Sequence, residues 1–152
     1  MKVLNQQVAF ILELDRLKSV YRRTYVQSDN NRNENSAEHS WHISMVANVL
    51  HEYAHEPVDI SRVINMLLIH DIVEIDAGDN FAFAPQSELD GQEDKEMQAA
   101  ERLFGLLPEI QFLPMKALWI EFEEAESADA RFAKAIDRIH PLLQNMANNG
   151  GS

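Results

Sequence analysis

An apolar stretch in the middle of the chain carries three side chains that could perform chemistry. Residues 64–75 read INMLLIHDIVEI, so His70, Asp71 and Glu74 are its ionisable exceptions. A carboxylate removed from water needs a cation or a hydrogen-bonding partner. On a helix, spacings of three and four residues bring these side chains to one side. Two readings remain open: a divalent metal ion that satisfies the cluster, or a capped helix end with a buried His–Asp hydrogen bond.

Two residues elsewhere in the chain could complete a metal site. His39 lies on the inward face of another expected helix. Asp137 follows the apolar Ile136 on a separate expected helix near the end of the chain. The plainer explanation for His39 is a core histidine bonded to a carbonyl group. For Asp137 it is a surface ion pair. Two imidazoles and two carboxylates would suit a harder divalent ion, and the set admits Mn, Co, Ni, Fe, Zn or Mg.

Composition limits the class of protein. The 152 residues predict one domain, residues 1–152. A net charge of −12, from 13 Lys+Arg against 25 Asp+Glu, argues against a nucleic-acid polymer as partner. Without cysteine, thiolate nucleophiles and Cys-ligated metals are excluded, and the composition fits a reducing cytosol. Because no apolar run approaches the ~20 residues that span a bilayer, we expect a cytoplasmic protein and no membrane partner.

The spacing of apolar residues predicts an all-α bundle of about six helices. The first three are expected over roughly residues 3–21, 37–54 and 59–75. After a long loop over 76–92, three more helices are expected around Phe104, Trp119 and Ile136. The expected N-caps are Ser36, Asp59, and either Ser127 or Asp129. Strand-like alternation is not found, so no β-structure is predicted.

The order of the candidate residues resembles the H…HD…D signature of HD-domain phosphohydrolases. His39, His70–Asp71 and Asp137 match it directly. Four longer runs resemble the 5′-deoxynucleotidase-like branch: Arg16–Leu17–Lys18 leading to Arg22, residues 32–40 (RNENSAEHS), residues 70–74 (HDIVE) followed by Gly78–Asp79, and residues 133–138 (AKAIDR). The resemblance extends from about residue 8 to 146. One such run is weak support, whereas four in order at fitting spacing are specific.

The resemblance implies an HD-domain helical bundle in which one divalent ion is bound by His39, His70, Asp71 and Asp137. It also implies that Glu74 handles the proton of the attacking water and that Asp79 contacts the sugar or an ordered water. The absence of histidine between Asp71 and Asp137 favours one metal ion over two. His42 is expected to be a core histidine or a support for a ligand.

For the substrate, the resemblance implies that Arg22 contacts the phosphate, which fits the planar fork of a guanidinium group. Arg23 is expected to bind substrate too, although the branch carries a pocket-shaping tryptophan at that place, so base and sugar preference stays open. The resemblance further suggests a homodimer, and a C-terminal cover helix that is truncated or absent here.

The expected activity is metal-dependent hydrolysis of a small phosphomonoester, foremost a nucleoside or deoxynucleoside 5′-monophosphate. Two alternatives remain. One is a phosphodiesterase or non-nucleotide phosphatase of the same superfamily, and the other is a non-catalytic helical module that binds a metal or a nucleotide. The carboxylate of Glu74 argues against a binding module, because binding alone needs no group that handles the proton of water.

Overall fold

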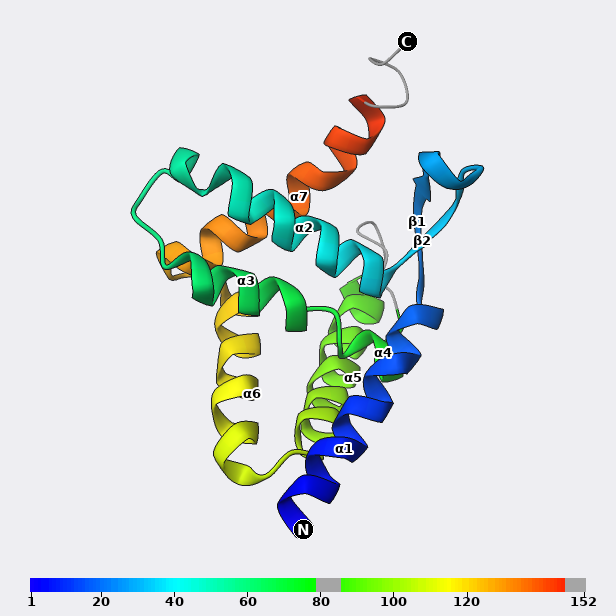
Figure 1. Cartoon of the computed structure of the whole chain (residues 1–152), viewed down its shortest axis with the longest axis vertical. Helices are drawn as coiled ribbons and strands as arrows, with labels where there is room; N and C mark the ends of the chain where they lie inside the picture. The colour runs from blue at the N-terminus through cyan, green and yellow to red at the C-terminus, as the bar shows by residue number, and fades with distance from the viewer. Residues whose placement is uncertain (79–85, 147–152) are drawn as a thin grey trace.

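Helices make up most of the computed structural model, which describes residues 1–78 and 86–146. Within these ranges six helices have ten residues or more and one has four: α1 (Lys2–Leu14), α2 (Ser36–Leu50), α3 (Ile60–Ile69), α4 (Glu74–Ala77), α5 (Gln86–Phe104), α6 (Glu109–Glu124) and α7 (Ala128–Asn145) (Figure 1). The predicted all-α class is therefore confirmed. The loop expected over 76–92 is shorter than predicted, since α5 already begins at Gln86.

A small β-hairpin is the main departure from the prediction. The first helix, expected to reach residue 21, ends at Leu14 and is followed by a 3-10 helix, η1 (Asp15–Ser19). Strands β1 (Tyr21–Val26) and β2 (Arg32–Asn35) then pair antiparallel, so the expectation of no strand was wrong. Polar residues occupy the inner side of this hairpin, which is why hydrophobic alternation did not reveal it.

Helix α2 begins with a capping box that positions its first turn. The side chain of Asn35 accepts a hydrogen bond from the backbone N–H of Glu38, and Glu38 accepts one from the N–H of Asn35. Ser36, expected as the cap, is instead the first helical residue and is buried. Ser40 and Ser44 on the same helix are buried too.

The helix expected over 59–75 is interrupted where its polar residues lie. Helix α3 ends at Ile69, and the chain tightens into a turn in which Ile72 N–H bonds to Ile69 O (3.1 Å) and Glu74 N–H to Asp71 O (2.9 Å). Such three-residue bonds are those of a 3-10 turn, which often marks a functional site inside a helical run. His70 and Asp71 therefore lie on a turn between α3 and α4.

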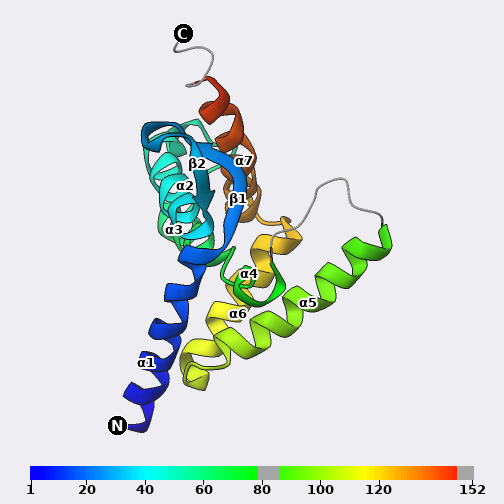
Figure 2. The ribbon, with the colours of Figure 1, turned by 90° about the vertical axis from the view of Figure 1, so that its right-hand side faces the viewer.

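Two apolar clusters support this turn from either side. Helices α2, α3 and α7, with Phe122 from the end of α6, form the cluster around Ile43 and Met66. Helices α1, α5 and α6 form the other around Phe10, Phe104 and Trp119. Figures 1 and 2 show these two groups of helices at opposite ends of the long axis, with α4 between them. Among the described helices, none is long and apolar enough to cross a membrane.

Candidate metal centre

His70 presents an unpaired ring nitrogen to the centre of the molecule. The side chain is buried, and its Nδ1 donates a hydrogen bond to the carbonyl of Leu67 (2.6 Å). In the neutral ring, the form that can bind a metal ion, the proton is therefore on Nδ1 and the lone pair is on Nε2. In the described part of the chain, Nε2 has no hydrogen-bond partner, but it lies 3.2 Å from Asp71 Oδ1 and 3.6 Å from Asp137 Oδ1.

His39 and Asp137 meet this nitrogen from α2 and α7. The His39 side chain is fully buried, and its Nε2 lies 2.7 Å from Asp137 Oδ1. One donor atom from each of His39, His70 and Asp137 lies within 4.8 Å of the other two. Burial alone would raise the pKa of Asp137, but its contacts with the two histidines hold that pKa well below its usual range.

Asp71 adds a second carboxylate, and Arg22 approaches it from the hairpin. Asp71 Oδ2 is buried without a hydrogen-bond partner among the described residues, and Arg22 Nη1 lies 3.5 Å away. Arg22 Nε is 3.4 Å from Glu34 Oε1 and is itself buried without a hydrogen bond. The guanidinium group thus balances two carboxylates and retains donor capacity for an anion.

These residues fit a divalent metal ion. Two imidazole nitrogens and two carboxylates are suitable ligands, and the unpaired His70 Nε2 and Asp71 Oδ2 are buried atoms that an ion would satisfy. Burial disfavours charge on His70, but Asp71 and Asp137 outweigh it and raise the pKa of His70 to about 9. The field that attracts a proton so strongly would also attract a metal cation. Three of the four predicted ligands, His39, His70 and Asp137, are therefore brought together, and Asp71 lies beside His70.

A polar cavity of about 420 Å³ opens beside the four ligands. Glu74 lines it and is 8% exposed, and Ser36 Oγ donates a hydrogen bond to Glu74 Oε1 (3.2 Å). Lys134 contributes an ammonium group that lies 4.4 Å from the centre of the Phe122 ring. This arrangement combines a metal site, a carboxylate that could accept a proton and a cation that could meet an anionic ligand.

Several residues around the site had no role in the sequence prediction. Lys134 and Glu34 belong to the matched runs, so the resemblance contained a signal for them. Glu96 on α5 also lines the cavity, where burial and Glu123 raise its pKa to about 7. Glu96 shares a helix face with the buried Gln92 and Ala100, so a charged residue at this spacing among inward positions was the available signal.

Behind His39 lies a chain of histidines, of which the sequence analysis considered only His42. His42 is exposed, so it is not a core histidine, and it meets the chain through His140. His140 is fully buried on α7, its Nδ1 lies 3.0 Å from His39 Nδ1, and its Nε2 lies 2.9 Å from His42 Nδ1. Burial and the neighbouring His39 lower the pKa of His140 to about 4, so it is neutral at physiological pH. The side chain that orients a metal ligand is usually a carboxylate or carbonyl, and here it is a third imidazole.

Two predicted residues lie apart from the cluster. Arg23 follows Arg22 on β1, where exposed and half-buried side chains alternate, so it is on the opposite, exposed face of the strand. The structure does not bring it to the cavity, and its role in substrate binding stays a prediction. Asp79 lies outside the described residues.

Comparisons with known proteins agree with this geometry. A family model described as an HD domain matches residues 14–152. The human 5′-deoxynucleotidase HDDC2 is 28% identical over 137 residues, which are 89% of this chain but 64% of that protein. A fission-yeast 5′-deoxynucleotidase, hdd1, is 23% identical over 143 residues, covering 90% of this chain and 69% of that protein. The chain thus spans less than two thirds of the human relative.

Solved structures lead to the same family. The crystal structure of a predicted metal-dependent phosphohydrolase from Magnetospirillum magnetotacticum is 52% identical, with a TM-score of 0.88 over 99% of this chain and 74% of that one. An HD-domain phosphohydrolase from Listeria innocua shares the fold, with a TM-score of 0.73 at 17% identity over 93% of this chain and 69% of that one. The resemblance seen in the sequence is confirmed, and the chain belongs to the HD-domain family.

Proposed function

We propose that the chain is a metal-dependent phosphohydrolase that cleaves a small phosphomonoester, foremost a nucleoside or deoxynucleoside 5′-monophosphate. The convergence of His39, His70 and Asp137 beside a polar cavity carries the proposal. The names of the relatives support the same class of substrate. A divalent ion held by the four ligands would polarise the phosphoryl oxygens and make a bound water more acidic.

Glu74 accepts the proton of the attacking water in this proposal. Its carboxylate lines the same cavity as His70 and Asp71, and the hydrogen bond from Ser36 limits its rotation. Proton transfer to a positioned carboxylate contributes about 10²–10⁴-fold to a rate. Ser36 can donate this hydrogen bond to Glu74 because the capping box at Asn35 places Ser36 on the first turn of α2.

Arg22 and Lys134 provide the positive charge that a phosphate needs. The chain as a whole is strongly acidic, so an anion is repelled until it meets local cations. Arg22 reaches Asp71 from the hairpin, and Lys134 lines the cavity from α7. A phosphate placed between them would receive charge-assisted hydrogen bonds from two directions.

A substrate panel tests the proposal. Protein freed of metal with a chelator is assayed with ribo- and deoxynucleoside 5′-monophosphates, an aryl phosphate and a phosphodiester, before and after adding Mn²⁺, Co²⁺, Mg²⁺ or Zn²⁺. We expect hydrolysis of monoesters that depends on the added ion. Preferential cleavage of the diester would favour the phosphodiesterase alternative, and nucleotide binding without hydrolysis would indicate a binding module. The expected homodimer and cytoplasmic location stay predictions.

A further inference from the structure

A second group of metal-binding side chains lies behind the candidate metal centre. Glu34 on β2, His42 on α2 and His140 on α7 each offer a donor atom within 4.8 Å of the other two. His140 Nε2 lies 2.9 Å from His42 Nδ1 and 4.0 Å from Glu34 Oε2. None of the three residues is among the ligands of the first centre.

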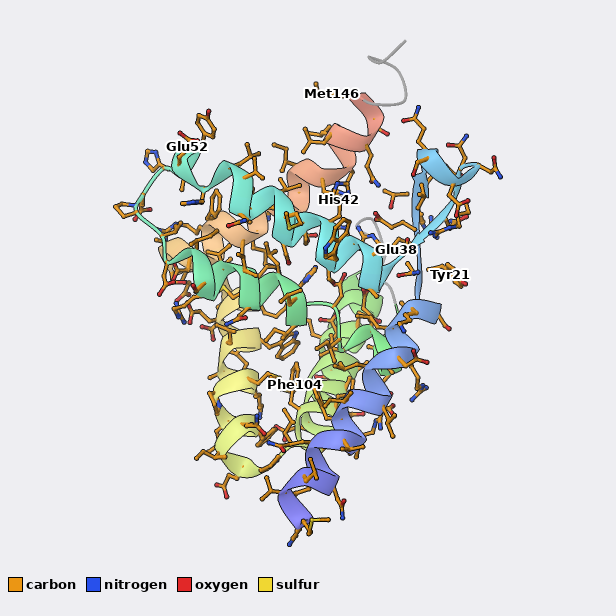
Figure 3. The ribbon with its side chains drawn as sticks, in the orientation of Figure 1. Tyr21, Glu38, His42, Glu52, Phe104 and Met146 are labelled. Carbon is orange, nitrogen blue, oxygen red and sulfur yellow. The ribbon has the colours of Figure 1, made fainter. Side chains whose placement is uncertain are left out.

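The group is accessible from solvent through a cavity of its own. Glu34 and His42 line a space of about 420 Å³ whose walls include Trp41 and Tyr25. Figure 3 shows His42 and Glu38 on the part of α2 that lies between α7 and the hairpin. Whereas His140 is fully buried, His42 is exposed, so an ion could enter from the His42 side.

We propose that Glu34, His42 and His140 form a second metal site for a transition-metal ion such as Zn²⁺ or Ni²⁺. Imidazole and carboxylate ligands suit these ions. With bonds of about 2.0–2.1 Å, tetrahedral ligand atoms lie roughly 3.3 Å apart, and the observed 2.9 Å and 4.0 Å lie on either side of this value. These two distances would have to change by about 0.4 Å and 0.7 Å, respectively, to reach that geometry.

Gln144 supports the carboxylate and adds a further donor. Its Nε2 donates a hydrogen bond to Glu34 Oε2 (3.2 Å), which fixes the oxygen nearest His140. Its Oε1 is buried and has no hydrogen-bond partner in the described ranges. Because Gln144 also lines the cavity, its amide is a candidate for an additional ligand.

The second site opposes the first through the contact between His39 and His140. A metal ion on Nε2 of His39 leaves the proton of that ring on Nδ1, facing His140 Nδ1 at 3.0 Å. For His140 to bind a metal through Nε2, its own proton must also be on Nδ1. Two N–H groups would then face each other, and the only other nearby acceptor in the described chain is Glu34 Oε1, 3.5 Å from His39 Nδ1.

This conflict predicts reciprocal antagonism between the two ions. A buried donor left without an acceptor weakens binding by about 5–150-fold. Because coupling between sites is reciprocal, an ion at the second site weakens binding at the first by the same factor. The second site would therefore act as an inhibitory site when the transition-metal ion is in excess.

Binding of Ni²⁺ tests the site without reference to hydrolysis. Trp41 stacks against His42, with ring centres 6.0 Å apart and planes at 27°, so a paramagnetic ion at His42 should quench its fluorescence. Titration of chelator-treated protein should give two equivalents by calorimetry, the weaker of which quenches. His42 is exposed, and His42→Ala should lose both the weaker equivalent of Ni²⁺ and the quenching of Trp41. The matched control at another exposed histidine, His51→Ala, should keep the weaker equivalent and the quenching.

The coupling is measured in the same titration. In His70→Ala, which disrupts the first centre, Ni²⁺ should bind the second site about 5–150-fold more tightly than in wild type preloaded with one equivalent. Asp71→Asn is the second variant, in case His70→Ala does not fold. The second site would be overturned if the wild type bound only one equivalent of Ni²⁺. It would also be overturned if His42→Ala bound the second equivalent as tightly as His51→Ala does. Equal affinities in loaded and disrupted protein would overturn the antagonism and leave the histidines a hydrogen-bonded support for His39.

Discussion

Replacing Arg22 by lysine separates the charge of this side chain from its shape. Arg22 is only 18% exposed and lies between the carboxylates of Glu34 and Asp71, at 3.4 Å and 3.5 Å. Both distances are longer than a good hydrogen bond, and Nε is unpaired within the described chain, so the fork can still donate to a phosphate. Lysine keeps the positive charge but cannot reproduce two parallel donors.

The size of the effect follows from the hydrogen bond that lysine cannot make. A hydrogen bond to a charged group contributes about 1.5–3 kcal/mol, and each 1.4 kcal/mol is a factor of ten. Since the side chain is mostly buried, solvent screens little of this energy. Arg22→Lys should therefore lower kcat/KM by about 10–150-fold on a single nucleoside monophosphate. Because the charge between Glu34 and Asp71 is retained, the melting temperature should change little.

Arg23→Lys is the matched control, since it makes the same chemical change on the exposed face of β1. An exposed side chain contributes at most about 1 kcal/mol, so its kcat/KM should stay within about fivefold of the wild type. Steady-state kinetics of both variants decide the matter. A larger loss in Arg23→Lys than in Arg22→Lys would show that the phosphate contact is assigned to the wrong residue of the strand.

Three other perturbations give measurable results. Glu74→Gln should retain the metal yet lose about 10²–10⁴-fold in kcat, because the amide keeps the shape but cannot accept the proton; near-normal turnover would make Glu74 structural. His70→Ala should lose the tightly bound metal equivalent, and elemental analysis after dialysis that finds it retained would refute the ligand assignment. Since folding raises the pKa of Glu96 from 4.5 to about 7, the folded state binds more protons than the unfolded one, and stability should fall as pH rises through this window. After allowance for solvent screening of a half-buried group, Glu96→Gln should be more stable than wild type by about 1 kcal/mol at pH 8. Near pH 4 the two proteins should be equally stable. Urea denaturation that shows no pH-dependent difference between them would contradict this.

The candidate metal ligands could be predicted because burial makes their chemistry visible in the sequence. His70 and Asp71 interrupt an apolar run, and an unpartnered carboxylate there would be costly, so either a cation or a hydrogen-bonding partner was required. His39 and Asp137 joined them through the resemblance, which the family match and the geometry confirm. Helical spacing did not reveal the 3-10 turn at His70, because that turn differs from an α-helix by one residue per hydrogen bond.

The hairpin and the histidine chain could not be predicted for a different reason. Both are held by polar contacts between segments far apart in sequence, such as His39 with His140 and Gln144 with Glu34. Hydrophobic periodicity detects a face that packs against apolar neighbours, and it carries no information about which polar groups meet. A buried glutamate on a short, polar strand therefore looks the same as an exposed one until the fold is known.

The charges around the cavity determine the order in which ligands can bind. Its walls contribute two groups that carry positive charge before a metal ion binds, Lys134 and His70, whose pKa is raised to about 9, against five carboxylates: Asp71, Glu74, Glu96, Glu123 and Asp137. At an effective dielectric constant near 20, each ionised carboxylate about 8 Å from a phosphate charge opposes binding by roughly 2 kcal/mol. Even with Arg22, which is engaged by two carboxylates, three positive groups face five carboxylates. The divalent ion must therefore bind before the nucleotide. In calorimetry with Glu74→Gln, in which turnover is expected to be slow, nucleotide affinity should fall at least about tenfold when the metal is withheld. Equal affinity in both conditions would show that the protein cations alone bind the phosphate.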